Sequence, residues 1–181
     1  VTGAVGSGKS CLINSLLGET FLCKGRLSLP RNQVSYVPQA AWIVNATVRD
    51  NIIGFGGAVY DETAYVEVLR ACSLTRDLEM MPDRDRTMIG ERGVNLSGGQ
   101  RQRISLARGA YAALKGHCKV VLLDDPLSAL DAHTSKAVFE ALLGPQGLLK
   151  GVARVLVTHA TQFLGACNSV VVLRRGSLIY V

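Results

Sequence analysis

The sequence predicts an α/β domain in which a mainly parallel sheet is flanked by helices. The apolar run at 119–123 is typical of a strand that is buried on both faces, and the runs at 155–157 and 170–173 are the next expected strands. Apolar residues at helical spacing occupy the stretches before and between these runs. Buried strands that alternate with helices are typical of α/β folds whose strands run parallel.

Local signals place the elements of the first half of the chain. A helix is expected after Ser10 and ends at Gly18, and a short strand at 33–37 ends at Pro38. Asp61 is the expected N-cap of a helix over 61–72. The candidate core residues of that helix are Ala64, Val66, Val68, Leu69 and Ala71.

The second half is more regular. A helix is expected to begin near 97–98, another covers about 134–143, and a last short strand at 178–181 follows a turn at 174–176. We expect a single domain over 1–181, whose core is 1–39 and 118–181 and whose helical insertion is 40–117. A domain of this kind has a strand before its first motif, so we also expect a fragment of a longer protein.

Composition excludes several classes of protein. The 181 residues are 48% hydrophobic and 19% charged, which argues against disorder, collagen and coiled coil. The net charge of +6 is compatible with an anionic partner, but an ordinary basic surface explains it better. The five cysteines form no CxxC pair, which indicates a reducing compartment rather than a disulfide scaffold or a zinc site.

The first motif is a phosphate-binding loop. Residues 3–10, GAVGSGKS, match GxxxxGK[ST] at every fixed position, namely Gly3, Gly8, Lys9 and Ser10. Glycines allow backbone N–H groups to point at phosphate oxygens, and the following helix adds its positive end. Lys9 is predicted to reach the β- and γ-phosphates, and Ser10 to offer its hydroxyl to Mg²⁺. The alternative is a glycine-rich turn with an unrelated lysine.

Two acids follow the strand at 120–123. Ligands bind at the carboxyl ends of parallel strands, so Asp124 is a candidate Mg²⁺ ligand. Asp125 stands where a general base would face an attacking water. The alternative is a plain strand end, because Asp-Asp-Pro also favours a turn.

A second anion site is predicted at residues 96–100, LSGGQ. This segment combines a helix N-terminus, a serine hydroxyl and two glycines, although an ordinary N-cap would look the same. The helix that follows carries Arg101, Arg103 and Arg108, which are expected on a solvated face.

Together these motifs resemble the nucleotide-binding domain of ATP-binding cassette (ABC) transporters, over the whole chain. The resemblance identifies 3–10 as Walker A, Gln39 as the Q-loop glutamine, 96–100 as the signature segment and 120–125 as Walker B. It also identifies 128–131 as the D-loop and His159 as the switch histidine. The stretches 36–52, 87–95 and 124–133 resemble the first such domain of the C subfamily, the group of the multidrug-resistance-associated proteins.

The resemblance implies a P-loop NTPase core with an inserted helical subdomain, an N-terminal β-subdomain that is truncated, and ATP and Mg²⁺ as cofactors. It implies that Gln39 and His159 are catalytic together with Asp125, and that Gln39 joins Ser10 and Asp124 at the metal. The residues implied to contact nucleotide are Gly3, Gly6, Ser7, Gly8, Lys9 and Ser10 for the domain's own ATP, and Ser97, Gly98, Gly99 and Gln100 for the ATP of a partner domain.

The implied partners are a second nucleotide-binding domain, arranged head to tail and expected in the same polypeptide, and transmembrane domains. The loop after Gln39 and the segment 90–93 are expected to touch the transmembrane domains, which places the domain on the cytoplasmic face of a membrane exporter. No nucleic acid is expected. Two alternatives remain: a regulatory domain of a C-subfamily channel or receptor, and a soluble ABC ATPase that acts on nucleic acid or the ribosome.

One residue departs from the family pattern. Active ABC ATPases usually have Glu where this chain has Asp125, and the shorter side chain withdraws the carboxylate from the water. A base out of reach loses a contribution of roughly 10²–10⁴-fold. We therefore expect slow hydrolysis at this domain's own site, unless a small backbone shift restores the reach of Asp125.

Overall fold

The computed structural model of the chain describes residues 1–29, 33–54, 60–91 and 94–180. The elements of the first half are α1 (Lys9–Leu17), β1 (Val34–Val37), β2 (Ala46–Thr47), α2 (Val48–Ile53), α3 (Glu62–Ala71), α4 (Thr75–Glu79), the 3₁₀ turn η2 (Arg84–Arg86) and β3 (Met88–Ile89). Those of the second half are α5 (Gly98–Leu114), β4 (Val120–Asp124), α6 (Ala132–Val138), the π-helical turn η3 (Phe139–Leu143), β5 (Ala153–Val157), the 3₁₀ turn η4 (Thr161–Ala166), β6 (Val172–Arg174) and β7 (Ser177–Tyr180).

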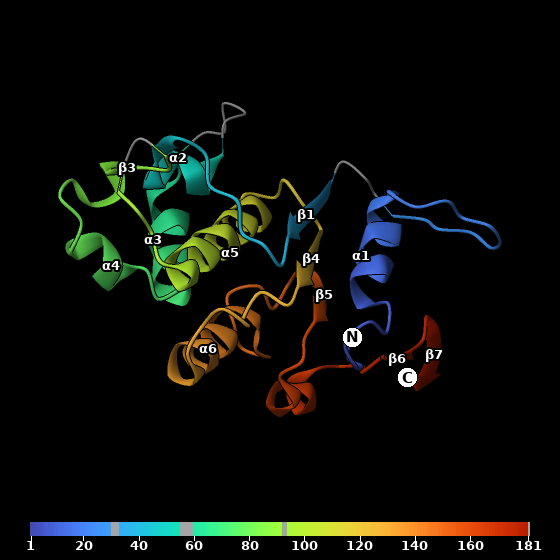
Figure 1. Ribbon diagram of the computed structural model, residues 1–181. Helices are drawn as coiled ribbons and strands as arrows, with labels where there is room; N and C mark the ends of the chain where they lie inside the picture. The colour runs from blue at the N-terminus through green and yellow to red at the C-terminus, as the bar shows by residue number, and fades with distance from the viewer. Residues whose placement is uncertain (30–32, 55–59, 92–93, 181) are drawn as a thin grey trace.

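A parallel sheet lies at the centre of the molecule. Its order is β1-β4-β5, and both pairings are parallel. Side chains of β4 alternate between its two faces: Leu122 packs with Ile13 of α1, whereas Val121 and Leu123 join the large core beside α5. Figure 1 shows α1 on one side of these strands and α5 on the other. The predicted α/β class with a parallel sheet flanked by helices is confirmed.

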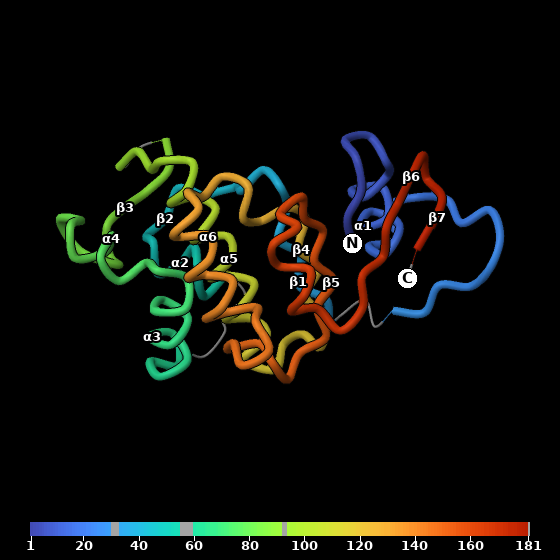
Figure 2. The backbone as a smooth tube through the Cα atoms, turned by 90° about the horizontal axis from the view of Figure 1, so that it is seen from below, coloured from blue at the N-terminus to red at the C-terminus, as the bar shows by residue number. Residues whose placement is uncertain are grey.

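The first two residues serve as the strand before the phosphate loop. The Val1 amino group donates to the Leu156 carbonyl (2.6 Å), and the Thr158 N–H donates to the Val1 carbonyl (3.0 Å). On the other side, the Thr2 N–H donates to the Val171 carbonyl and the Leu173 N–H donates to the Thr2 carbonyl. Residues 1–2 therefore lie between β5 and β6, and Figure 2 shows the N-terminus near β6 and β7.

The last two strands form an antiparallel hairpin, β6–β7. Arg175 and Gly176 both have positive φ, 50° and 77°, which gives the two-residue turn that tight hairpins prefer. The predicted turn is thus present, but the strand predicted at 170–173 begins two residues later, at Val172, which also pairs with Thr2. The strand predicted at 178–181 begins at Ser177; residue 181 lies outside the described residues.

The segment 40–117 is mostly helix and loop, with one short antiparallel pair, β2–β3. Asp61 caps α3 as predicted, because its side chain accepts from the Ala64 N–H. The core face of α3 includes Tyr65, Val68 and Leu69, whereas the predicted core residue Val66 is only partly buried. The division of the chain into core and insertion stays a prediction.

Helix α5 connects that segment to the sheet. It packs on α2 and α3 and also on β1 and β4. At Gly109 the helix comes so close to β1 that an added Cβ would lie 2.7 Å from Val37 Cγ2. Within the described ranges, no helix has the length and apolar character needed to cross a bilayer.

Candidate functional site

The phosphate loop curls around the start of α1. Gly6 and Gly8 have φ of 75° and 102°, the left-handed region that glycine adopts without strain. At Gly3 an added Cβ would collide with the carbonyl oxygen of Leu173, so the close pass between loop and β6 requires glycine. At Gly6 a Cβ would meet nothing within 4 Å, so at this position the positive φ rather than lack of space favours glycine. The backbone therefore has the concave shape that binds anions at a helix N-terminus.

Lys9 is a buried cation inside this loop. Its side chain is 7% exposed, and Nζ donates to the carbonyls of Gly3 (2.9 Å) and Ala4 (2.8 Å). Ser7 Oγ, also buried, lies 3.5 Å from the same ammonium. No carboxylate pairs with Lys9 in the part of the chain that the structure describes. A buried ammonium held only by neutral oxygens favours an anionic ligand beside it.

The carboxyl ends of all three parallel strands meet the loop. Gln39 lies two residues after β1, Asp124 ends β4, and His159 lies two residues after β5. These three residues line one cleft of about 300 Å³; its other lining residues are Val5, Gly6, Gly8, Lys9, Ser10, Cys11, Asp125 and Val157. The structure thus brings the predicted Walker A, Q-loop, Walker B and switch residues to the sheet edge where α/β folds bind ligands.

The two acids of the cleft are both buried, with 4% of Asp124 and 6% of Asp125 exposed. Gln39 and His159 are exposed at its rim. In the described ranges no group of three or more His, Cys, Asp and Glu forms a metal cage. One carboxylate and one hydroxyl, Asp124 and Ser10, match the way Mg²⁺ is held beside phosphates.

The backbone of Asp125 is tightly held. Its φ is +46°, its N–H donates to the Val157 carbonyl (2.9 Å), and its carbonyl accepts from Ser128 Oγ (2.8 Å). Left-handed backbone is uncommon outside glycine, although aspartate tolerates it better than most residues. These contacts fix the turn from β4 into the D-loop.

The signature segment lies outside the phosphate cleft. Ser97 caps α5: its Oγ accepts from the Gln100 N–H (3.1 Å), while Gln100 Oε1 accepts from the Ser97 N–H (2.9 Å). Ser97 and Gly98 are exposed, and Gly99 lies beside Ala129 of the D-loop. No residue of 97–100 lines the cleft around Lys9.

Two of the three arginines on α5 do not lie on a solvated face, so that prediction is wrong for them. Arg103 forms a partly buried ion pair with Asp77. Arg108 Nε donates to the Asn51 carbonyl (2.6 Å), and its guanidinium carbon lies 3.7 Å from the centroid of the Trp42 ring. Burial lowers the pKa of Arg108 to about 10. Arg101 is exposed, as predicted.

Sequence reasoning did not single out Asp77, and it assigned Arg108 to a solvated face, so it missed the contacts of both side chains. Asp77 contacts the signature glutamine, and Arg108 holds the loop that follows Gln39. Neither residue belongs to a sequence motif. Each bonds to residues that are 23 or more positions away in the sequence, which local patterns do not predict.

Comparisons with known proteins agree with this geometry. The profile of the family described as ABC transporter matches residues 1–128. Human "ATP-binding cassette sub-family C member 2" is 50% identical over 179 residues, 99% of this chain and 11% of that protein. Human "ATP-binding cassette sub-family C member 3" is 48% identical over 178 residues, and "Multidrug resistance protein mrp-7" of Caenorhabditis elegans is 47% identical over 178 residues; each match covers 98% of this chain and 11% of the relative.

The chain spans about a tenth of the length of these relatives, 11% in each case. The match nevertheless extends over nearly all of the chain and includes the loop, both acids and the signature segment. The predicted resemblance is confirmed: the chain belongs to the ABC transporter family and within it is similar to members of the C subfamily.

Proposed function

We propose that this domain binds ATP and Mg²⁺ in the phosphate cleft and works with a second nucleotide-binding domain to drive transport through a membrane exporter. The observation that carries the proposal is the cleft itself, where a buried ammonium, Lys9, and a buried carboxylate, Asp124, line one space with the loop glycines. A buried cation and a buried carboxylate that line one cleft suit a nucleoside triphosphate with a bound metal ion.

The roles of the residues follow from their places. Lys9 and the loop N–H groups bind the phosphates, and Ser10 and Asp124 hold Mg²⁺. When bound, Mg²⁺ neutralises charge that develops on the phosphate oxygens. Gln39 and His159, exposed at the rim, orient the attacking water and the γ-phosphate.

Slow hydrolysis at this site is the second part of the proposal. Asp125 is one methylene shorter than the usual glutamate, and hydrogen bonds with Val157 and Ser128 hold its backbone. A shift that brings the carboxylate forward would have to break these bonds. The restrained turn therefore supports a site that binds ATP firmly and cleaves it slowly.

The signature segment is proposed to close over ATP held by the second domain. Ser97 and Gly98 are exposed, and they do not line the cleft of their own chain. An exposed, well-capped helix N-terminus that cannot serve its own nucleotide is suited to a nucleotide on another domain. This is the head-to-tail arrangement implied by the family.

Docking to transmembrane domains is proposed for the loop after Gln39 and the segment 90–93, which follows β3. β2 pairs with β3, so that Ala46 lies opposite Ile89 and Thr47 opposite Met88. The exposed apolar side chains around this pair are Trp42, Val44, Met88 and Val94. Residues 92 and 93 of the predicted docking segment lie outside the described residues. An exposed apolar patch of this kind favours a protein partner.

The C-subfamily relatives favour the exporter over an ATPase that acts on nucleic acid. The test is photoaffinity labelling of the full-length protein that carries this chain, with an azido derivative of ATP. Lys9→Ala is expected to abolish labelling of this domain and ATP-driven uptake into inverted vesicles. Unchanged labelling would refute the assigned cleft, whereas lost labelling with unchanged channel or transport activity would favour the regulatory alternative.

A further inference from the structure

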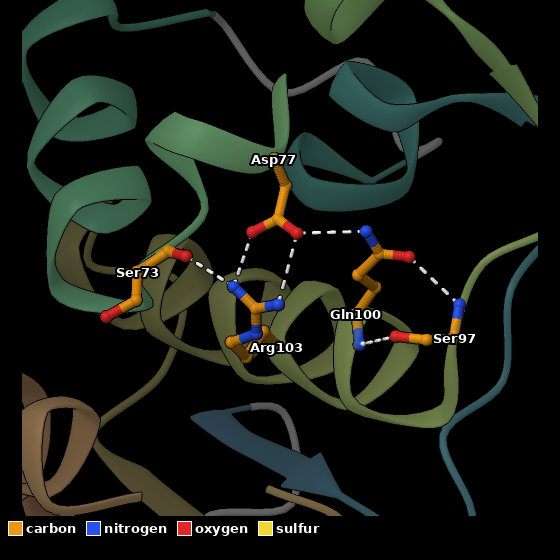
Figure 3. Close-up of polar contacts among 5 residues, drawn as sticks. All are labelled: Ser73, Asp77, Ser97, Gln100 and Arg103. Carbon is orange, nitrogen blue, oxygen red and sulfur yellow. Dashed lines mark hydrogen bonds and ion pairs between the residues drawn. The ribbon is translucent and has the colours of Figure 1, made fainter. Parts of the chain in front are cut away.

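The side chain of the signature glutamine has partners at both ends. Gln100 Oε1 accepts from the Ser97 N–H, and Gln100 Nε2 donates to Asp77 Oδ1 at 2.9 Å (Figure 3). The amide therefore lies between the cap of α5 and helix α4. The implied contact of Gln100 with the nucleotide of a partner domain stays a prediction, and these hydrogen bonds give the side chain a second role within its own chain.

Asp77 uses both of its carboxylate oxygens. Oδ2 accepts from Arg103 Nη1 at 2.5 Å, and Oδ1 accepts from Arg103 Nη2 at 3.2 Å as well as from Gln100. The two ionic side chains are only 15% and 14% exposed, so water screens the pair weakly. Arg103 Nη1 also donates to the Ser73 carbonyl, at the turn that leads into α4 (Figure 3).

These contacts join two helices. Gln100 and Arg103 are three residues apart on the first turns of α5, where they lie on one face. Asp77 lies on α4, a five-residue helix with no side-chain N-cap. Because the helix is so short, its own hydrogen bonds stabilise it only weakly. The turn before α4 has Ser73 in the left-handed region, φ 53°. The Asp77 carboxylate is thus a direct side-chain link between α4 and the start of α5.

We propose that Asp77 is a positioning residue of the signature segment: it fixes Gln100 and Arg103 so that Ser97 and Gly98 are presented to the nucleotide of the partner domain. This inference rests on the proposed function of the signature segment. Asp77 touches no nucleotide and acts through the amide of Gln100.

An Asp77→Asn substitution tests the link. In one orientation the new NH₂ group faces Arg103 Nη1, and in the other it faces Gln100 Nε2 and Arg103 Nη2, so a donor opposes a donor in both. Loss of a hydrogen-bonded charge pair of this burial corresponds to an effect of about 10- to 100-fold. We expect a fall of that size in ATP-dependent trapping of nucleotide at the partner's site, with nucleotide labelling of this chain's own cleft unchanged.

The double variant Asp77→Asn/Gln100→Glu is the rescue. The new carboxylate at position 100 accepts from the new NH₂ group at position 77 and from the Ser97 N–H, which keeps the capping box. The new amide oxygen at position 77 accepts from Arg103. The 77–100 contact and Arg103 Nη1 then pair a donor with an acceptor again, with the polarity of the 77–100 contact reversed. Arg103 Nη2, whose bond to Asp77 Oδ1 is the longer one at 3.2 Å, is left facing the new NH₂ group, so we expect partial recovery. A merely structural loss would not be repaired by adding a second change, so recovery of trapping is specific to the link.

The assay uses the full-length protein, with vanadate trapping of an azido nucleotide and separation of the two domains by proteolysis. Asp85→Asn is the matched control, because Asp85 forms an ion pair of similar length, 2.7 Å, with Arg49 in the same segment, and this pair lies apart from the contacts of Gln100. Gly98→Asp, which blocks the signature itself, tests the proposed function.

The outcomes separate the two ideas. A loss in Asp77→Asn that exceeds the loss in Asp85→Asn, with recovery in the double variant, supports the inference. Equal losses in Asp77→Asn and Asp85→Asn, or a double variant that stays inactive, overturn it. If Asp77→Asn does not accumulate, the double variant alone decides. Normal trapping in Gly98→Asp would instead overturn the function proposed for the signature segment.

Discussion

Replacing Asp125 by Glu is expected to accelerate ATP cleavage at this domain's own site. The extra methylene extends the side chain by about 1.5 Å, one C–C bond. A general base that comes within hydrogen-bond reach of the water contributes about 10²–10⁴-fold to the rate. The substitution changes no other group that lines the cleft.

The backbone of residue 125 reduces the gain. Its φ of +46° is tolerated by Asp and less well by Glu, and a strained residue of this kind costs about 1 kcal/mol or more. Because about 1.4 kcal/mol is a factor of ten in rate, a cost of about 1 kcal/mol in reaching the reactive geometry removes about fivefold. The net expectation is an increase of about 10- to 10³-fold, with a fall in unfolding free energy of about 1 kcal/mol.

The measurement is a single-turnover assay on the full-length protein, with labelled ATP and with the catalytic base of the second site removed. Asp125→Asn is the control: if Asp125 is out of reach of the water, removing its charge lowers the rate little further. The reasoning is refuted if Asp125→Asn abolishes the residual rate and Asp125→Glu gives no increase, since Asp125 would then already act as the base.

Three further results are expected. Gly109→Ala should lower the unfolding free energy by about 1–3 kcal/mol in chemical denaturation, because the new Cβ would lie 2.7 Å from Val37 Cγ2; unchanged stability would contradict the close packing. Arg108→Ala should destabilise by about 2–4 kcal/mol and increase the acrylamide quenching of Trp42, which is already 49% exposed, because it removes the hydrogen bond to the Asn51 carbonyl and the stacking on Trp42. Cys11, exposed at the cleft, should react with maleimide and be protected by Mg-ATP, whereas Cys72, whose pKa is raised to about 12 by burial, should react only after unfolding; equal rates would contradict both placements.

Sequence alone predicted the parts of the molecule that depend on local signals. The helix after the phosphate loop ends at Gly18, whose φ is 81°, and Asp61 and Ser97 cap their helices as the residue types suggest. The apolar run at 119–123 became the central strand β4. Because parallel strands end at one edge, the acids after β4 could be expected near the loop without knowledge of the packing.

The wrong predictions for the arginines of α5 have one physical cause: this helix is buried on more than one side. Helix α5 packs against α2, α3, β1 and β4, so its polar residues cannot form a solvated stripe. Gln102 and Ser105 are buried, and Gln102 Nε2 donates to the Pro38 carbonyl. The spacing of apolar residues in a helix predicts only which face is apolar. It does not predict that polar side chains on the other faces are buried and satisfied by long-range hydrogen bonds.

The same helix joins the regions that the proposed mechanism needs to move together. Its first turns hold the signature residues, and Arg108, about 16 Å further along the axis, holds Trp42 of the loop after Gln39. An α-helix packed on both the sheet and its neighbours moves as a rigid body rather than bending. Under the docking proposed above, a displacement of the exposed Trp42 loop would reach Ser97 through α5, and Asp77 would connect it to α4. The substitutions Asp77→Asn and Arg108→Ala therefore test the two ends of this proposed connection, at α4 and at the Trp42 loop.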